Sequence, residues 1–299
     1  MLGSHGLARL APNEIDGEKM SLTTTLLLGR NAHTVRFTER PRGTLAVTLV
    51  DKPNEKAAGT SATLSPKERA ALERDVRKMF SLDDDLAPFY AAIADDADLS
   101  FATRGAGRMF RSPTAFEDVV RTICTTNCAW GGTTRMIEAL VAHLGKRAPG
   151  APKEGWRGRA FPTPEAMAAA GAAFYRDLAR AGYRGAYLQK LAELVAEGTL
   201  DLEAWRDAPR DTLSDEELEE RLLELPGVGP YAAAHVMLLF GRHSRLVLDS
   251  WTRPCYAEIM GRKRISDRAI ARRFKKYGAD AGLAFWLLLW KDRHLALDC

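Results

Sequence analysis

The hydrophobic pattern divides the chain into a short β-rich part and a long helical part. Segments 23–28, 33–37 and 44–50 are rich in β-branched and apolar residues, and turn formers such as Pro41 and Gly43 separate them. Short runs of this kind between turn signals are typical of strands. The pattern therefore predicts a small antiparallel sheet near the start of the chain.

From residue 65 onward the apolar spacing becomes helical. Ser65 followed three residues later by Glu68 is a capping box, and Leu72, Val76 and Met79 then form one apolar stripe. Helical spacing continues over 115–144, 164–178, 186–197, 215–223, 231–240, 251–259, 266–276 and 281–290. The predicted fold class is α+β, mostly helical with an N-terminal antiparallel sheet.

Three regions are expected along the chain. Residues 1–19 are rich in Gly, Ala and polar side chains, and we interpret them as a flexible extension outside the fold. Residues 20–100 are predicted to form the β-rich domain and a linker helix. Residues 101–299 are predicted to form a helical core.

Composition places the chain among soluble globular proteins. Of its 299 residues 46% are hydrophobic and 27% charged. The longest apolar run, 281–290, is shorter than the ~20 residues that a membrane-spanning helix needs, so no membrane association is expected. The four cysteines (Cys124, Cys128, Cys255 and Cys299) are too few and scattered for a disulfide framework, which predicts a cytoplasmic protein.

The net charge of +4 hides two regions of opposite sign. Residues 201–224 contain ten acidic and three basic side chains, whereas residues 261–276 contain eight basic and one acidic. A basic cluster attracts polyanions, of which nucleic acid is the commonest. A solvated basic helix face explains the same cluster equally well.

Residues 225–231 read Leu-Pro-Gly-Val-Gly-Pro-Tyr, between two predicted helices. Gly227 and Gly229 favour a tight hairpin, and a missing Cβ allows a phosphate to approach the backbone N–H groups at the next helix N-terminus. Downstream, Asp249 ends the apolar run 246–248 just before another predicted helix. Taken alone, the hairpin is interpreted as a simple turn that connects two helices, and Asp249 as an N-cap.

Taken together, the hairpin, the helix after it and Asp249 resemble the helix-hairpin-helix DNA glycosylase superfamily. Segments 108–117, 123–127 and 182–188 are similar to its 3-methyladenine and 8-oxoguanine branches, and segment 80–85 resembles their linker from the β domain. The resemblance extends from about residue 22 to about residue 294. It implies two helical subdomains flanking a cleft for double-stranded DNA, with the hairpin region at about 215–240.

The resemblance also implies roles for individual residues. Asp249 matches the catalytic aspartate, which stabilises positive charge on the deoxyribose as the base leaves. Tyr231 stands where bifunctional members have a lysine nucleophile, and because a phenol forms no Schiff base, we expect a monofunctional enzyme. The hairpin residues Gly227, Val228 and Gly229 are expected to hold a phosphate.

Expectations about cofactors follow from the same resemblance. A monovalent cation is implied at the backbone carbonyls of Leu223, Leu225 and Val228, and no side-chain metal site is expected. Some members hold an iron–sulfur cluster on four closely spaced C-terminal cysteines, whereas only Cys255 and Cys299 lie in that region here, so no cluster is expected.

The expected DNA contacts and base pocket draw on several further residues. Asn127 matches a family asparagine in the DNA cleft, with a helix-end cap as the alternative role, and three arginines are candidate phosphate ligands: Arg104, Arg108 and Arg111. The candidate walls of the base pocket are Tyr231, His235, Trp130, Phe285 and Trp286. Each of these aromatic residues also suits a hydrophobic core.

The predicted substrate is a damaged purine, since aromatic faces bind cationic alkylated bases well. The 8-oxoguanine branch reads its base with a glutamine near the position of Phe285, and the absence of that glutamine argues against 8-oxoguanine. Some mismatch uracil and thymine glycosylases have a tyrosine at the position of Tyr231, so these bases stay an alternative. A non-catalytic lesion-binding protein is another. The predicted partner is damaged or mispaired double-stranded DNA, bound by a monomer.

Overall fold

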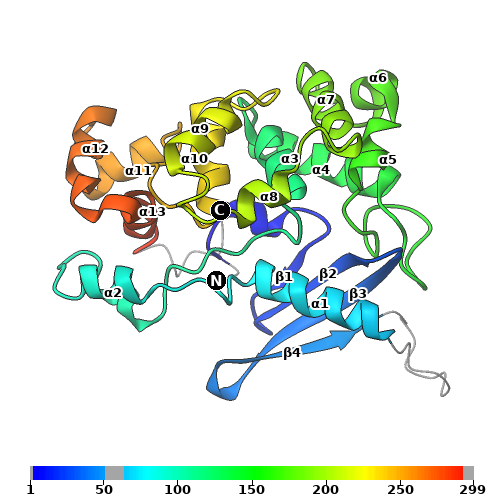
Figure 1. The fold of residues 1–299 in the computed structure, drawn as a ribbon, viewed down its shortest axis with the longest axis horizontal. Coiled ribbons are helices and arrows are strands. Elements are labelled where there is room, and N and C mark those ends of the chain that lie inside the picture. The colour runs from blue at the N-terminus through cyan, green and yellow to red at the C-terminus, as the bar shows by residue number, and fades with distance from the viewer. Residues whose placement is uncertain (1–2, 51–63, 292–299) are drawn as a thin grey trace.

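The computed structural model describes residues 3–50 and 64–291, which form one sheet and two groups of helices (Figure 1). Strands β1 (Glu14–Asp16), β2 (Ser21–Leu28), β3 (Asn31–Arg40) and β4 (Thr44–Leu49) pair antiparallel in the order β1-β2-β3-β4. The predicted antiparallel sheet is confirmed. It also contains β1, whose three residues are too short for a readable pattern.

Helix α1 (Pro66–Met79) packs against the sheet. The predicted capping box is present: the Glu68 N–H donates to Ser65 Oγ at 3.3 Å, and the Ser65 N–H donates to Glu68 Oε2 at 2.8 Å. These bonds satisfy backbone donors that a helix start leaves open. Buried side chains of α1, β2 and β3 then share one small core with Phe80 and Phe110.

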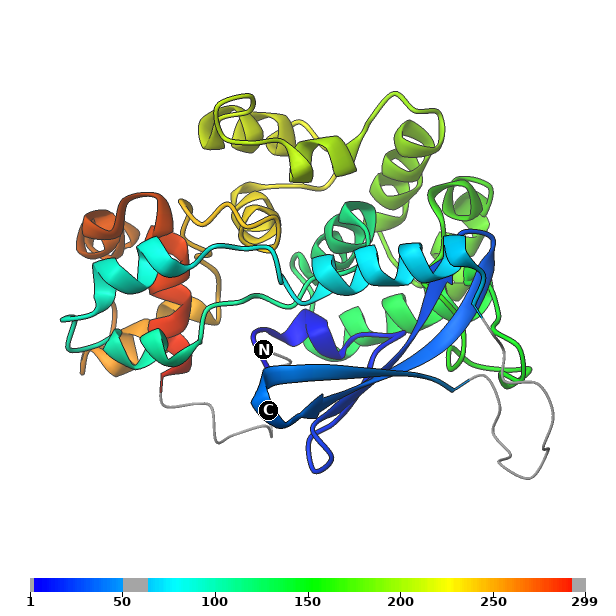
Figure 2. The same ribbon diagram turned by 60° about the horizontal axis from the view of Figure 1, so that its bottom comes forward.

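The remaining helices belong to two hydrophobic cores (Figures 1 and 2). The first core is built by α3 (Ala115–Thr125), α4 (Trp130–Leu144), α5 (Pro164–Ala168), a π-helical turn (Phe174–Leu178), α7 (Arg184–Ala196), α8 (Leu202–Asp207) and α9 (Asp215–Leu223). The short α6 (Gly171–Ala173) precedes the π-helical turn and has no buried residue. The second core is built by α2 (Ala87–Ile93), α11 (Thr252–Ile259), α12 (Asp267–Phe274) and α13 (Ala281–Trp290), with short 3₁₀ helices at Ser100–Arg104 and Lys275–Asp280.

Helix α10 (Pro230–Leu239) belongs to both cores. Ala232, Ala233 and Val236 lie in the first, and Ala234 and Leu238 lie in the second. A helix that is apolar all round needs partners on every side, and α10 finds them in both groups. Helix α10 is therefore shared by the two helical groups, and we call it the shared helix.

Two of the predicted boundaries are wrong. The described residues 3–19 do not form the predicted extension: Leu7, Leu10 and Ala11 are buried in the first core, and β1 pairs with β2. The boundary at residue 100 also fails, because α2 packs in the second core together with α13 (Figure 2). In both regions the apolar side chains are buried by residues far away in the chain, which the spacing of hydrophobic residues cannot predict.

Two predicted helical segments are interrupted. Within 164–178, α5 ends at Ala168 and α6 begins at Gly171, whose φ is 73°. The spacing over 115–144 suggests continuity, but α3 ends at Thr125 and α4 begins at Trp130. Asn127 between them has a φ of 46°, in the left-handed region. Among the described residues, none of the helices combines the length and apolarity that crossing a bilayer requires.

Candidate active site

The hairpin between α9 and α10 exposes backbone donors at the start of α10. Gly227 has a φ of +79°, and a Cβ there would lie 2.8 Å from Tyr187 Cδ2, so this position requires glycine. Gly229 has a φ of −105°, and an added Cβ would meet no heavy atom within 4 Å. No described residue accepts a hydrogen bond from the amides of Gly229, Tyr231 or Ala232. Open amides at a helix N-terminus suit an anion.

Asp249 lies half-buried in front of α11. Its Oδ1 accepts hydrogen bonds from the N–H groups of Trp251 at 2.9 Å and Thr252 at 2.6 Å, and its own N–H donates to Thr252 Oγ1 at 2.8 Å. Asp249 therefore orients the first turn of α11. Its second carboxylate oxygen accepts no hydrogen bond from a residue in 3–50 or 64–291, which leaves that oxygen available to a ligand.

The Tyr231 hydroxyl connects α10 to α3 and lies within electrostatic reach of Asp249. It is 3.1 Å from Thr125 Oγ1 and 3.3 Å from His235 Nδ1. Burial raises the pKa of Tyr231 to about 12, and the Asp249 charge acts in the same direction. The phenol is therefore protonated at neutral pH.

Tyr231 begins a cluster of aromatic rings between α10, α11 and α13, called here the aromatic cluster. The His235 ring lies 5.8 Å from that of Tyr231 and 5.7 Å from that of Trp286, and Trp251 lies 6.1 Å from Trp286 and 5.5 Å from Trp290. His235 is 5% exposed, and burial lowers its pKa to about 4, so it is neutral at pH 7. The cluster offers aromatic faces close to Asp249.

No model of a known protein family matches the chain. A probable N-glycosylase/DNA lyase of Methanothermobacter thermautotrophicus is 27% identical over 221 residues, covering 67% of each chain. The structure is similar to that of the 3-methyladenine DNA glycosylase of Archaeoglobus fulgidus, with a TM-score of 0.69, 20% identity and coverage of 99% of this chain and 95% of that one. It is also similar to the Clostridium acetobutylicum 8-oxoguanine glycosylase/lyase, solved with double-stranded DNA that carries cytosine opposite 8-oxoguanine. There the TM-score is 0.68 and the identity 19%, over 97% and 92% of the two chains.

The chain has the helix-hairpin-helix DNA glycosylase fold. The predicted resemblance is therefore confirmed. In this glycosylase fold, Tyr231 lies in the first turn of the shared helix α10 and packs against both cores, and Asp249 precedes α11 of the second core.

A surface beside the hairpin contains polar and aromatic side chains. Exposed Asn127 donates from Nδ2 to the Tyr183 hydroxyl at 3.4 Å, and the Tyr183 ring lies 5.9 Å from that of Tyr187, which packs under Gly227. Arg184 fixes this arrangement, since it donates to the Thr126 and Asn127 carbonyls and stacks on Tyr183 at 4.6 Å. This surface adjoins the hairpin.

Several predicted site residues lie elsewhere. Arg111 is 8% exposed and ion-paired with Asp84, and Arg108 donates to the Ser81 and Asp84 carbonyls, so both hold the chain together and neither is a free phosphate ligand. Arg104 is exposed and stays a prediction.

The predicted walls of the base pocket divide into two sets. Tyr231, His235 and Trp286 meet in the aromatic cluster, whereas Phe285 is 0% exposed and packs against Phe274 and Tyr256. Consecutive residues of a helix point about 100° apart, so α13 cannot offer both Phe285 and Trp286 to one site. The prediction for Phe285 is wrong. Trp130 is 46% exposed, and its ring packs on Gly6.

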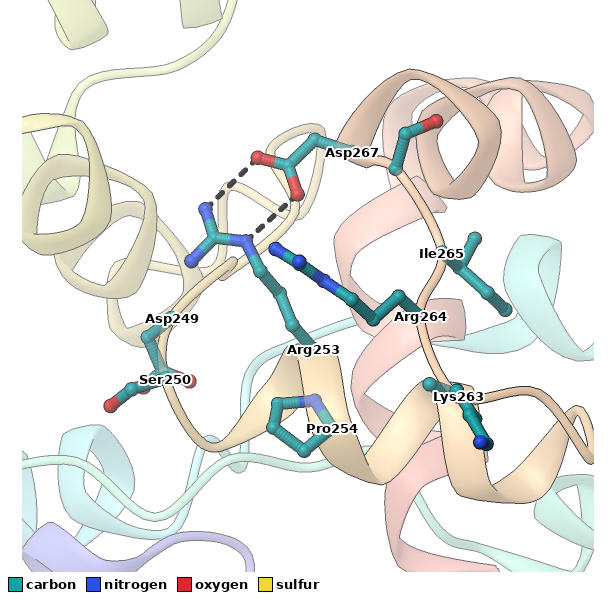
Figure 3. A pocket seen from close by; sticks show the side chains of 10 residues that line it. Asp249, Ser250, Arg253, Pro254, Lys263, Arg264, Ile265 and Asp267 are labelled. Atoms are coloured by element: carbon teal, nitrogen blue, oxygen red, sulfur yellow. Dashed lines mark hydrogen bonds and ion pairs between the residues drawn. The ribbon is translucent and has the colours of Figure 1, made fainter.

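A cavity of about 440 Å³ opens next to Asp249 (Figure 3). Arg253, Lys263 and Arg264 line it together with Asp267, which pairs with Arg253 through two hydrogen bonds of 2.8 and 2.9 Å. Elsewhere in the basic cluster, Arg273 pairs with Asp98 and Lys276 with Asp96. Internal partners therefore neutralise part of the cluster, while the side near Asp249 keeps a positive excess.

The predicted cation ligands lie in the hairpin. The Leu225 carbonyl accepts the Val228 N–H at 3.1 Å, while no described residue donates to the carbonyls of Leu223 or Val228. A monovalent cation at these carbonyls stays a prediction. No group of three or more metal-binding side chains occurs in the described part of the chain. Cys299 lies outside that part, and so does the end of the family resemblance near residue 294.

Sequence reasoning missed two neighbours of the site. Trp251 joins the aromatic cluster, and it follows Asp249 so closely that its position in the same loop was a usable signal. His5 lies 6.0 Å from His235, ring centre to ring centre. Its place in the sequence gives no signal, because it lies in the segment 1–19 that the composition predicts to be an extension.

Proposed function

We propose that the chain is a DNA glycosylase that hydrolyses the N-glycosidic bond of a damaged base. The observation that carries the proposal is the position of Asp249. One carboxylate oxygen is fixed by the backbone of α11, the other is open, and the carboxylate lies within electrostatic reach of the Tyr231 hydroxyl. A base cannot be reached inside the duplex, so the nucleotide is extruded first.

The residues then divide the chemistry between them. Departure of the base leaves positive charge on the deoxyribose, which a fixed carboxylate stabilises more in the transition state than in the ground state. The open oxygen of Asp249 also accepts a proton from the attacking water. The amides of Gly229, Tyr231 and Ala232 bind a backbone phosphate and position the duplex without reading its sequence.

We further propose a monofunctional enzyme. Strand cleavage by the lyase route needs an amine that forms a Schiff base, and the α10 residue that feels the charge of Asp249 is Tyr231, whose phenol is protonated at neutral pH. The relative from Methanothermobacter and the Clostridium protein are both described as lyases, so strand cleavage is the outcome that needs a direct test.

Alkylated purines are the proposed substrates, and the protein is proposed to act as a cytoplasmic monomer. Electron-rich faces of Tyr231, Trp251 and Trp286 attract a flat cation, and alkylation makes a purine cationic. His235 is neutral and therefore does not repel that cation. Uracil or thymine paired with guanine, and binding without catalysis, are the alternatives that the experiment separates.

The experiment is base release from duplexes that carry methylated purines, hypoxanthine, 8-oxoguanine, uracil or thymine opposite guanine, with and without alkali. Strand breaks only after alkali support a monofunctional glycosylase. Breaks without alkali contradict it, and no release from any duplex favours the binding protein.

Asp249→Asn provides the matched variant. Asparagine keeps an oxygen for the α11 cap but removes the charge, so we expect base release to fall by a factor of about 10³ or more with DNA affinity retained. Asp201→Asn is the control, because Asp201 also caps a helix: it precedes α8 and accepts from the Ala204 N–H at 2.9 Å. An equal loss of base release in both variants would contradict a catalytic role for Asp249.

A further inference from the structure

Two buried imidazoles meet beside the candidate active site. His5 and His235 are 4% and 5% exposed, and their ring planes are nearly perpendicular, at 89°. One ring nitrogen of each, His5 Nδ1 and His235 Nε2, has no hydrogen-bond partner among the described residues. Buried polar atoms without partners are rare in native proteins and point to a ligand or a bound water.

The protonation of His5 follows from its single bond. Its Nε2 lies 2.6 Å from the Phe110 carbonyl oxygen, which only accepts, so Nε2 carries the proton. Burial lowers the pKa of His5 to about 3, and the ring is neutral. His5 Nδ1 is consequently a bare acceptor.

The protonation of His235 follows from a chain of three bonds. The Thr125 hydroxyl donates to the Thr122 carbonyl at 2.6 Å, so it must accept from the Tyr231 hydroxyl at 3.1 Å. With its one proton used, Tyr231 can only accept from His235 Nδ1 at 3.3 Å. His235 Nε2 is therefore also a bare acceptor.

These two acceptors border the aromatic cluster, which the proposed function assigns to the extruded base. His235 lies one helical turn after Tyr231, and the Trp286 ring next to it donates from Nε1 to the Ser4 carbonyl at 2.7 Å. That bond ties residues 4–5 to α13. The N-terminal residues and the shared helix thus contribute one acceptor each to the same aromatic surroundings.

We propose that His5 Nδ1 and His235 Nε2 accept hydrogen bonds from the exocyclic amino group of the extruded base. This inference rests on the proposed function and narrows its substrate class. The site then selects bases such as alkylated adenine over their keto counterparts. A keto oxygen brings a third acceptor to two acceptors and leaves all of them unpaired, which disfavours binding.

The test is a binding measurement that does not depend on catalysis. Free 3-methyladenine and 3-methylhypoxanthine differ at C6, amino against keto, and each is titrated into the full chain while tryptophan fluorescence is followed. We expect the amino base to bind about tenfold or more tightly. His5→Phe and His235→Phe should each reduce that preference about fivefold.

Conservative variants separate hydrogen bonding from packing. His5→Asn and His235→Gln keep a polar group near Nδ1 and Nε2 respectively and should retain most of the preference. His243→Phe is the matched control: this histidine is also buried with an unpartnered Nε2, but it lies 3.4 Å from Asp280 in the loop after α10. The His243→Phe variant should keep the full preference for the amino base.

Nitrogen NMR of the unsubstituted chain covers the case in which a variant fails to fold. Each neutral histidine contributes one ring nitrogen without a proton, so the signals are first assigned; those of His5 Nδ1 and His235 Nε2 should be unprotonated, and both should shift on addition of 3-methyladenine. An unchanged amino preference in both phenylalanine variants, or nitrogens that do not respond, overturns the inference and assigns the acceptors to bound water. If the chain prefers the amino base but releases no base from DNA, the proposed function fails and the inference stands.

Discussion

At the scale of single residues, Asp249 has two roles that do not exclude one another. Its Oδ1 caps α11, as the simplest sequence interpretation predicted, and its other oxygen is open. The cap fixes the carboxylate, and a fixed charge stabilises a transition state without reorganising.

The two roles are separable by substitution. Asp249→Ala removes the cap and should lower the free energy of unfolding by about 1 kcal/mol, whereas Asp249→Asn should lower it less. Urea denaturation of both variants at pH 7 measures the difference. Equal stability would mean that the cap contributes nothing.

Asp75 gives a prediction about pH. It is 8% exposed, and burial raises its pKa to about 6, above its unfolded value. The folded state therefore holds the proton more tightly, so the contribution of this group to stability is complete below pH ~4 and is lost as the pH rises through about 6.

Asp75→Asn removes the buried charge. At pH 7.5 the variant should be more stable than the original chain by up to about 3 kcal/mol, and at pH 4 the two should be alike. Urea denaturation at both pH values tests this, with exposed Asp95→Asn as the control. A stabilisation independent of pH would rule out this explanation.

Residue roles were predictable where a motif brings its own geometry. The hairpin, Tyr231 and Asp249 lie within 23 residues of one another (227–249) and are joined by α10, so their proximity could be read from spacing. The structural role of Arg111 could not be predicted in this way, because its partner Asp84 is 27 residues away and its burial arises from tertiary packing.

At the scale of elements, the two hairpin glycines have different tasks. Gly227 is required by its positive φ and by the contact with Tyr187, whereas Gly229 has ordinary backbone angles and open space in front of it. The sequence predicted one shared role. The structure separates folding at Gly227 from access at Gly229.

Alanine at each position tests this separation. Gly227→Ala should cost about 1–3 kcal/mol of stability. Gly229→Ala should change stability by less than about 0.5 kcal/mol but weaken binding to all DNA sequences alike, since its Cβ enters the path of a phosphate. Thermal denaturation and fluorescence anisotropy with two unrelated duplexes measure both effects. A base-dependent loss in Gly229→Ala would contradict phosphate binding.

The periodicity located most helices to within a residue or two, because apolar spacing and caps are local. It failed between α3 and α4, where Asn127 adopts a left-handed conformation that the Arg184 guanidinium stabilises from 57 residues away. Local patterns do not record such support.

At the scale of the whole molecule, residues 4–11 connect the parts. The buried Arg121 guanidinium donates to the carbonyls of Leu7 at 2.8 Å and Ala11 at 3.1 Å, and His5 reaches α10. A composition rich in Gly, Ala and polar residues predicts an extension, but composition does not reveal which apolar residues are buried in a core.

Leu10 tests that correction. It is 1% exposed in the first core, so Leu10→Ala should lower the free energy of unfolding by about 2–5 kcal/mol. Leu82→Ala, at a residue 45% exposed, should cost less than about 0.5 kcal/mol. If both variants lost equally little stability, residues 4–11 would contribute nothing to the first core, and the predicted extension would be correct.

The contacts of Arg121 with residues 7–11 span more than 100 positions of the chain. Residues 4–11 are synthesised before α3 and before Trp286 of α13, so they cannot reach their buried positions until those helices are present. Until then Leu7 and Leu10 face solvent, where a chaperone that shields short apolar stretches would bind them.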